Sequence, residues 1–574
     1  SSDLISNNSN QVRHDTDLTA FQVTNLVFKN TDNLNYCGNL GSASGNPLAL
    51  RLNNLPQYGI NQYNLYKCTM RPFGFSNERI IDTRIFYTRG VKKEQNFCVN
   101  HYQHIIKNLA AGIDYFRVVS PGLYKNQSAD ITAFDVYMLF ETMNHRYGFY
   151  TGYISNSEKN EENGGLIYDS LLTYTKRSNW STVPVHLNDG KSYNRNKSIF
   201  LRHQFNFIID EQKKDSIISS VPRLFLQHEF HYDKESYAFD VTSWDSAYFL
   251  NTFDSVSSYD SSFFGNIYNK LIFGFNNENK SISINGGVEN LISHYTNDRT
   301  VTDSSFINIT GQADFVLLKD VSLRNSISAN VAGAPGTFYL NSGLQYRFNN
   351  QTAGLRLILK NELPAFFEQQ YQSTHFRWDN SFGNTAISSF SLFYEREFID
   401  VNAYFNSYKN FITWSRTATP VQISQGVSVL SLKLGYHFKT GDFYYRGNVT
   451  LNYSNSNYAF SLPLFNSYTS VYYAHSFFKK VMNIQVGLDC FYNTAYYANG
   501  FNPATAHFYY QDVTTTGNFA YVDAFAAARI KSVKFYFKCE NVGGRLWGSD
   551  YYMSAHYPLF GRAFKIGVEW RFYD

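Results

Sequence analysis

Apolar and polar residues alternate along most of the chain. In residues 428–438, apolar side chains occupy every second position: Leu430, Leu432, Leu434, Tyr436 and Phe438. Ser431 and Lys433 lie between them. Successive side chains of an extended strand point to opposite faces, so this segment predicts a strand with one apolar and one polar face. The pattern recurs in 321–331, 338–348, 443–453, 482–490, 533–541 and 562–572.

The length of these segments favours a membrane barrel over a soluble β-sandwich or propeller. They run about 10–13 residues, whereas strands of globular proteins average roughly 5–6. A tilted strand needs about 9–11 residues to cross a bilayer. Aromatic residues gather at the segment ends, as at a membrane interface. We therefore predict an all-β fold, a single transmembrane antiparallel β-barrel.

Short and long connections also alternate along the chain. Short turns are predicted near 439–442, 478–481 and 529–531, and long loops near 156–196, 455–465, 495–516 and 543–560. In outer-membrane barrels the short turns are periplasmic and the long loops extracellular. We count about 20 strands, with a range of 18–22 whose upper limit includes a pair at 82–91 and 94–104.

The alternation divides the chain into two parts. Residues 61–574 are predicted to form the barrel, which must close because an open edge would leave backbone groups unpaired in lipid. Residues 1–60 alternate poorly and are expected to be a periplasmic tail or a segment that occludes the lumen. The chain begins Ser1-Ser2-Asp3, so we expect an exported outer-membrane protein whose signal peptide is absent from this sequence.

Composition supports the same fold. Aromatic residues make up 18% of the chain, charged residues only 17%, and the mean hydropathy is −0.35. Soluble domains usually carry about 25% charged residues. No apolar run approaches the roughly 18 residues of a spanning helix. The net charge of +4 is too balanced for a dedicated nucleic-acid binder.

No catalytic or metal-binding motif stands out. His228 and His231 flank Glu229 and Phe230, but in a strand these two histidines would point to opposite faces. The five cysteines show no CxxC spacing, and a disulfide among Cys37, Cys68 and Cys98 is left open. We expect no enzyme activity, no metal and no cofactor.

The polar face of the strands would line the lumen. Our candidate lumen-lining residues are Arg223, Arg324, Arg347, Arg356, Lys433, Arg446, Asp489, Lys534, Lys538, Lys565, Glu569 and Arg571. With Lys360, Asp114, Glu229 and Glu540, the sampled face carries 11 basic and 5 acidic residues. This count predicts a mildly cationic lumen with a weak anion preference.

Several short motifs resemble the putative porin family of Bacteroidetes outer membranes. The matching stretches are 120–127 (SPGLYKNQ), 162–165 (ENGG), 183–187 (VPVHL), 199–201 (IFL), 540–544 (ENVGG), 551–562 (YYMSAHYPLFGR) and 570–574 (WRFYD). The resemblance implies an outer-membrane barrel that acts as a channel. It implies no catalytic or ligand-binding residue.

The C-terminus also looks like that of TonB-dependent receptors, but about 20 strands leave no room for the plug of over 100 residues that such receptors carry. By resemblance to outer-membrane proteins generally, Trp570 and Phe572 form a signal for the barrel-assembly machinery.

Two functions follow as expectations. The first is a porin for passive diffusion of small solutes. The alternative is a non-conducting barrel subunit of a larger outer-membrane complex for transport, secretion or assembly. Expected partners are outer-membrane lipid and lipopolysaccharide, the assembly machinery during biogenesis and other outer-membrane or periplasmic proteins, with no nucleic acid.

Overall fold

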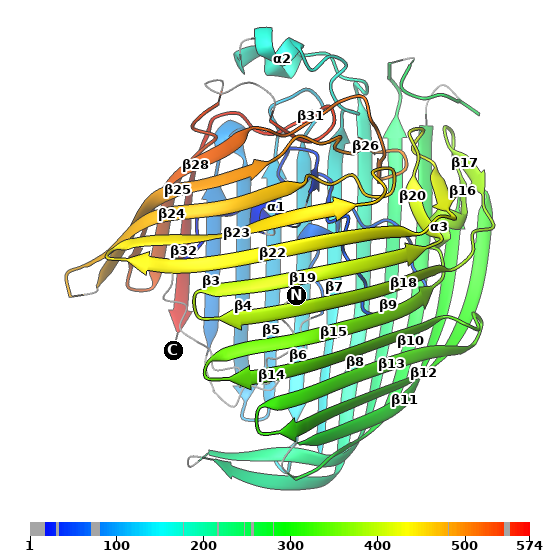
Figure 1. Cartoon of the computed structure of the whole chain (residues 1–574), viewed down its shortest axis with the longest axis vertical. Helices are drawn as coiled ribbons and strands as arrows, with labels where there is room; N and C mark the ends of the chain where they lie inside the picture. Colours follow the sequence, from blue (N-terminus) through cyan, green and yellow to red (C-terminus); the bar gives the residue numbers. More distant parts are fainter. Residues whose placement is uncertain are drawn as a thin grey trace.

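A computed structural model shows the chain as a closed antiparallel barrel (Figure 1). It describes residues 18–29, 32, 34–70, 81–175, 177–214, 217–245, 247–253, 258–278, 281–479, 481–544 and 551–573. Residues 1–17 of the predicted N-terminal part lie outside the described residues. Among the described residues, no helix has the length and apolar character to cross a membrane.

Twenty-two strands form the barrel wall. They are β3 (Asp82–Arg89), β4 (Gln95–Ile106), β5 (Leu109–Ser120), β6 (Ala129–Glu141), β7 (Tyr147–Glu162), β8 (Gly190–Lys214), β9 (Ile217–Val241), β10 (Ser258–Asn276), β11 (Ile282–Asn297), β12 (Thr300–Leu318), β13 (Val321–Ala332), β14 (Phe338–Phe348), β15 (Gln351–Glu362), β18 (Thr385–Arg396), β19 (Ile399–Lys409), β22 (Val427–Thr440), β23 (Phe443–Ser454), β24 (Phe465–Phe477), β25 (Met482–Asn493), β28 (Ala520–Ile530), β29 (Val533–Glu540) and β32 (Ala563–Tyr573).

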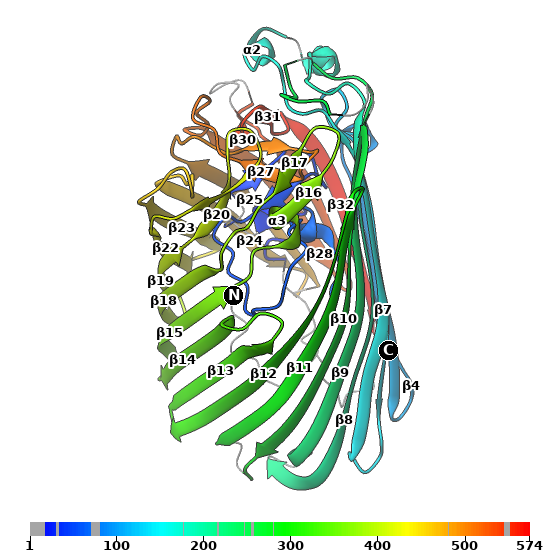
Figure 2. The same cartoon turned by 90° about the vertical axis from the view of Figure 1, so that its right-hand side faces the viewer.

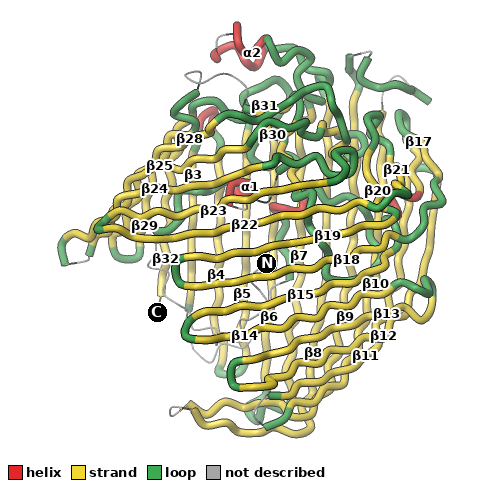
Figure 3. Tube along the Cα trace, viewed as in Figure 1, coloured by secondary structure: helices red, strands yellow, loops and turns green. Residues whose placement is uncertain are grey.

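The remaining elements are short (Figure 3). Five two-stranded sheets comprise β1 (Asn35–Tyr36), β2 (Ser44–Gly45), β16 (Gln370–Gln372), β17 (Arg377–Asp379), β20 (Phe411–Trp414), β21 (Pro420–Ile423), β26 (Gly500–Asn502), β27 (His507–Tyr509), β30 (Tyr552–Ser554) and β31 (Tyr557–Pro558). The α-helices are α1 (Leu26–Lys29), α2 (Leu171–Tyr174) and α3 (Phe366–Gln369); 3-10 turns span Asn64–Tyr66, Val91–Lys93 and Arg177–Thr182.

The predicted fold class is confirmed, at the upper limit of the predicted strand range. The strand pair predicted at 82–91 and 94–104 corresponds to β3 and β4. The barrel closes where β3 pairs with β32, in a register that places Asp82 opposite Tyr573. Exposure alternates in the phase of the sequence pattern: on β29, Phe535 and Phe537 are 45% and 49% exposed, whereas Lys534 and Lys538 are buried.

Several strands are longer than predicted. The long loop expected at 156–196 spans only residues 163–189, because β7 continues to Glu162 and β8 begins at Gly190. The longest strands, β8 and β9, contain 25 residues each. Beyond the apolar band both faces of a strand meet water or polar groups, so the hydrophobic alternation ends before the backbone pairing does.

The N-terminal part of the chain runs inside the barrel (Figure 2). We call residues 18–70 the inner segment. The first barrel strand begins at Asp82, so residues 61–70, which were assigned to the barrel, still belong to this segment. Most of its apolar side chains are buried, among them Val23, Val27, Tyr36 and Tyr63.

Candidate functional site

The inner segment is fixed to the barrel wall by polar contacts on opposite sides. The Gln22 amide donates to Asp489 Oδ2 of β25 at 2.9 Å. The Lys433 ammonium of β22 lies 2.9 Å from Asp32. On the far side of the barrel, Lys67 lies 3.4 Å from Glu235 of β9. The segment is therefore held across the whole width of the lumen.

The segment reaches the extracellular ends of the strands. There the Tyr63 hydroxyl donates to Glu162 at 2.8 Å, and the Tyr58 hydroxyl donates to the Ser262 carbonyl at 3.1 Å. Glu162 belongs to the acidic stretch 158–162, which the sequence pattern places in a loop. It instead ends strand β7, so Glu158 and Glu162 are buried and face inward.

Aromatic residues of the extracellular loops close over this part of the segment. Phe367, Trp414 and His507 form one stack, in which the His507 ring lies 3.8 Å from Trp414 and 5.5 Å from Phe367. The Nε2 atom of His507 is 3.1 Å from the Gly59 carbonyl oxygen of the inner segment. Burial lowers the pKa of His507 to about 4, so the ring is neutral at pH 7. Loops and segment thus share one apolar core at the extracellular mouth.

Five of the motifs that carry the family resemblance, 120–127, 162–165, 183–187, 540–544 and 551–562, meet at this mouth. Asn126 donates to the Glu162 carbonyl at 2.9 Å, and the Leu166 amide donates to the His556 carbonyl at 2.9 Å. Gly38 of the inner segment packs against Pro558, which belongs to the motif 551–562. The φ angle of Gly38 is +82°. A Cβ atom there would lie 2.2 Å from the Pro558 carbonyl oxygen, so only glycine fits. The motifs therefore shape the contact between loops and segment.

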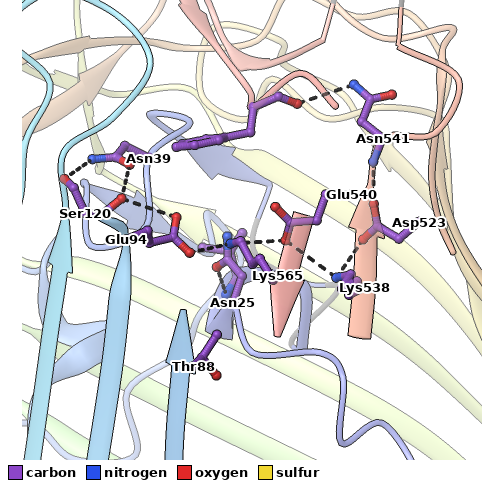
Figure 4. A network of polar contacts seen from close by, with 12 residues as sticks. Asn25, Asn39, Thr88, Glu94, Ser120, Asp523, Lys538, Glu540, Asn541 and Lys565 are labelled. Carbon is purple, nitrogen blue, oxygen red and sulfur yellow. Dashed lines mark hydrogen bonds and ion pairs between the residues drawn. The ribbon is translucent and has the colours of Figure 1, made fainter. Parts of the chain in front are cut away.

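A chain of buried charges lies beside the segment, on the wall formed by β28, β29 and β32 (Figure 4). Lys538 lies 2.7 Å from Asp523 and 3.7 Å from Glu540. Lys565 lies 3.2 Å from Glu540 and 2.7 Å from Glu94. The Ser120 hydroxyl, 3.4 Å from Glu94, joins this chain to the inner segment by donating to Asn39 at 2.6 Å. These charges are buried, so each depends on its partners.

Most candidate lumen-lining residues have a polar partner. Lys534 lies 3.2 Å from Glu569, and Arg324 lies 3.4 Å from Asp314. Further partners are Glu278 for Arg223, Asn341 for Arg356, Asp32 for Lys433, Gln22 for Asp489, Asp523 for Lys538, Glu94 for Lys565, Arg84 for Glu569 and Asp82 for Arg571. Arg347 and Arg446 are exposed.

The sequence count overstated the positive charge of the inner face. It sampled only some strands and so omitted Asp82, Glu94, Asp314 and Asp523, each of which pairs with a sampled cation. The period-2 pattern identifies Asp82, Asp314 and Asp523 once β3, β12 and β28 are included. Glu94 precedes β4 and gives no periodic signal.

Cavities remain between the segment and the wall. One of about 520 Å³ is lined by Lys29, Arg84, Asp114 and Glu569 among others. Another of about 660 Å³ lies near the periplasmic turns, beside Leu18, His437 and Arg446. Both are lined by a mixture of polar, charged and apolar side chains, so the lumen is filled at its extracellular end and partly open below it.

The other candidates lie outside this site. His231 faces inward, 2.7 Å from Glu229, whereas His228 faces outward, 3.1 Å from His203. Within the described residues, none of the five cysteines forms a disulfide. Trp570 and Phe572 are 48% and 39% exposed on β32, with ring centroids 4.4 Å apart. Among the described residues, no group of three His, Cys, Asp or Glu side chains is arranged to hold a metal ion.

Solved structures with a similar fold are receptors and transporters. The ferric-catecholate import receptor Fiu from E. coli K12 aligns with a TM-score of 0.61 at 11% identity, over 86% of this chain and 82% of that chain. The siderophore receptor PirA from Acinetobacter baumannii gives 0.60 at 9%, over 87% and 81%. The copper transporter OprC gives 0.61 at 10%, over 88% and 82%. At such identities the likeness shows the fold alone.

The barrel thus resembles those of TonB-dependent receptors, the class that the length argument set aside. The inner segment, residues 18–70, is shorter than the plug of over 100 residues that such receptors carry. Among curated proteins, no sequence matches the chain. The family model described as "Putative porin" matches residues 2–574, so the chain belongs to this family and is an outer-membrane β-barrel.

Proposed function

We propose that the protein is a channel for passive diffusion of small solutes, closed in this conformation by its inner segment and extracellular loops. The observation that carries the proposal is the path of the segment, which binds Asp489 on one side of the lumen and Glu235 on the other. Barrels of this strand number are wide enough to need such an obstruction.

The cavities favour a lumen that solutes can enter over a lumen that is completely packed with side chains. The two large cavities below the mouth are lined by both polar and charged side chains. Groups of this kind line water-filled spaces, whereas the mouth itself is closed by rings such as Phe367 and Trp414. Opening would therefore require the segment and the loops to separate at the aromatic core.

The proposed channel has only a weak ion preference. Lys534, Lys538 and Lys565 pair with carboxylates, so they contribute little net potential to a passing ion. Exposed Arg347 and Arg446 retain their positive charge. A small anion preference is the most that this arrangement supports.

The alternative proposal is a non-conducting subunit of a larger outer-membrane complex, and the packed mouth favours it. In either role, we expect the barrel-assembly machinery to recognise Trp570 and Phe572, which are exposed on the last strand.

Planar-bilayer recording of the full-length protein tests the proposal. We expect a low conductance with brief openings, and a reversal potential under a salt gradient that shifts only slightly toward anions. Clear cation selectivity would contradict the expected ion preference. A silent protein that co-purifies with a stable partner would contradict the channel and favour the subunit role.

A further inference from the structure

The outer wall of the barrel carries a compact group of cations on β8 and β9. In the antiparallel register, Lys197 of β8 lies directly opposite Lys234 of β9. Arg195 precedes Lys197 by two residues on β8 and lies on the same face. All three side chains are exposed. Like charges directly opposite one another destabilise a strand pair unless an anion lies between them.

These cations have no protein counterion. Within the part of the chain that the structure describes, no ion pair joins Arg195, Lys197 or Lys234 to a carboxylate. Lys234 instead lies 5.2 Å from the centroid of the Tyr232 ring. Its neighbour on β10 is Gly265, which has no side chain of its own and is covered by the Phe263 ring. Both lysine side chains remain exposed on the outer face.

Other charges on the same wall are compensated. Arg117 of β5 lies 3.0 Å from Asp130 of β6. His294 of β11 lies 2.6 Å from Asp303 of β12. Lys191, higher on β8, lies opposite Glu161 on one side and Asp240 on the other. Among the described residues, positive charge therefore gathers around Lys197 and Lys234, and Lys159 of β7 adds to it on the same face, 5.9 Å from the Tyr193 ring.

Lys197 and Lys234 lie where the outward-facing side chains change from apolar to polar. One step toward the periplasm, the register aligns an outward-facing apolar row across five strands: Tyr153, Ile199, Tyr232, Ile267 and Ile292. Ile199 and Ile292 are 48% and 46% exposed, as expected of lipid-facing side chains. The Lys197–Lys234 pair belongs to the first polar row above them, on the side of the long loops. That is the level of the headgroups of the outer leaflet.

A groove extends from the cations toward the extracellular side. It has a volume of about 600 Å³ and is lined by Tyr193, Arg195, Ser236, Tyr259, Phe263 and Asp298 among others; Asp298 accepts a hydrogen bond from Ser261 at 2.9 Å. Exposed aromatic rings beside hydroxyl groups form a surface suited to a sugar. From the periplasmic toward the extracellular side, the outer wall therefore presents apolar side chains, then cations, then an aromatic groove. The acyl chains, phosphate and sugar of a phosphorylated glycolipid follow one another in the same order.

We propose that Lys197, Lys234 and Arg195 bind the phosphate of a phosphorylated glycolipid of the outer leaflet. Its acyl chains lie over Ile199 and Ile267, and its sugar lies in the groove beside Tyr259. The phosphate supplies the anion that the opposed lysines lack, through charge-assisted hydrogen bonds. This site depends on the outer-membrane location and not on whether the lumen conducts.

Native mass spectrometry of the full-length protein in detergent micelles, titrated with diphosphorylated lipid A, tests this site. The double variant Lys197→Gln/Lys234→Gln is expected to bind about a hundredfold more weakly, since it removes two charge-assisted bonds and each is worth about a factor of ten. Lys197→Arg/Lys234→Arg should keep the affinity. Arg117→Gln is the matched control on the same wall and should bind as the native protein does.

Three results would overturn the proposal. The first is unchanged binding by the double variant, and the second is equal binding of lipid A after removal of its phosphates. The third is full competition by inorganic phosphate alone, which would show that the site binds any small anion. Retention of the heat-modifiable band on gels shows that each variant is folded.

Discussion

Replacing Lys538 with methionine is expected to lower the free energy of unfolding by about 3–5 kcal/mol, because it leaves the buried carboxylate of Asp523 without its cation. Lys538 is 2% exposed and lies 2.7 Å from Asp523, which is fully buried. Glu540 keeps a second cation, Lys565, at 3.2 Å. The loss therefore falls mainly on Asp523, whose remaining partner is the Asn541 amide at 2.8 Å.

Urea unfolding in lipid vesicles, followed by tryptophan fluorescence, measures this change. Adding Asp523→Asn to Lys538→Met removes the isolated charge and should recover most of the loss, so the two changes are strongly coupled. Arg117→Gln serves as control: its partner Asp130 is exposed, and such pairs contribute about 0–1 kcal/mol. A loss below about 1 kcal/mol for Lys538→Met would show that water reaches Asp523.

Removing residues 1–81 is expected to convert a nearly closed barrel into a wide aqueous pore. The deletion keeps every barrel strand, since β3 begins at Asp82. It removes the contacts to Asp489, Glu235 and Glu162 that hold the segment in the lumen. It also takes Tyr58 and Tyr63 out of the aromatic core, so the loops lose much of what they pack against.

Single-channel conductance measures the effect, with the full-length chain refolded in parallel as control. Heat modifiability on gels shows whether the shortened barrel has folded. A folded deletion variant with the same low conductance as the full-length chain would show that the loops alone close the lumen.

The strand wall was predictable because it follows a local rule. In β29 and β32 a period of two residues separates Phe535 and Ile566, which face lipid, from Lys538 and Lys565, which face inward. The rule needs no knowledge of distant contacts. It therefore predicted the fold class, although not where the longest strands end.

The site within the lumen was not predictable, because its contacts join distant parts of the chain. Gln22 meets Asp489, and Gly38 packs against Pro558, without any periodic signal in residues 18–70. The count of lumen charges failed for a related reason. A strand pattern shows that Lys538 faces inward, but only the assembled barrel shows that Asp523 lies beside it.

Hydrogen-exchange mass spectrometry of the native protein in lipid bilayers tests most directly the central claim, that the inner segment occupies the lumen. Peptides covering residues 18–70 should exchange slowly, with protection comparable to that of the barrel strands, because the segment is buried and anchored on both sides. Exchange of these peptides within seconds, while β28, β29 and β32 stay protected, would contradict the account.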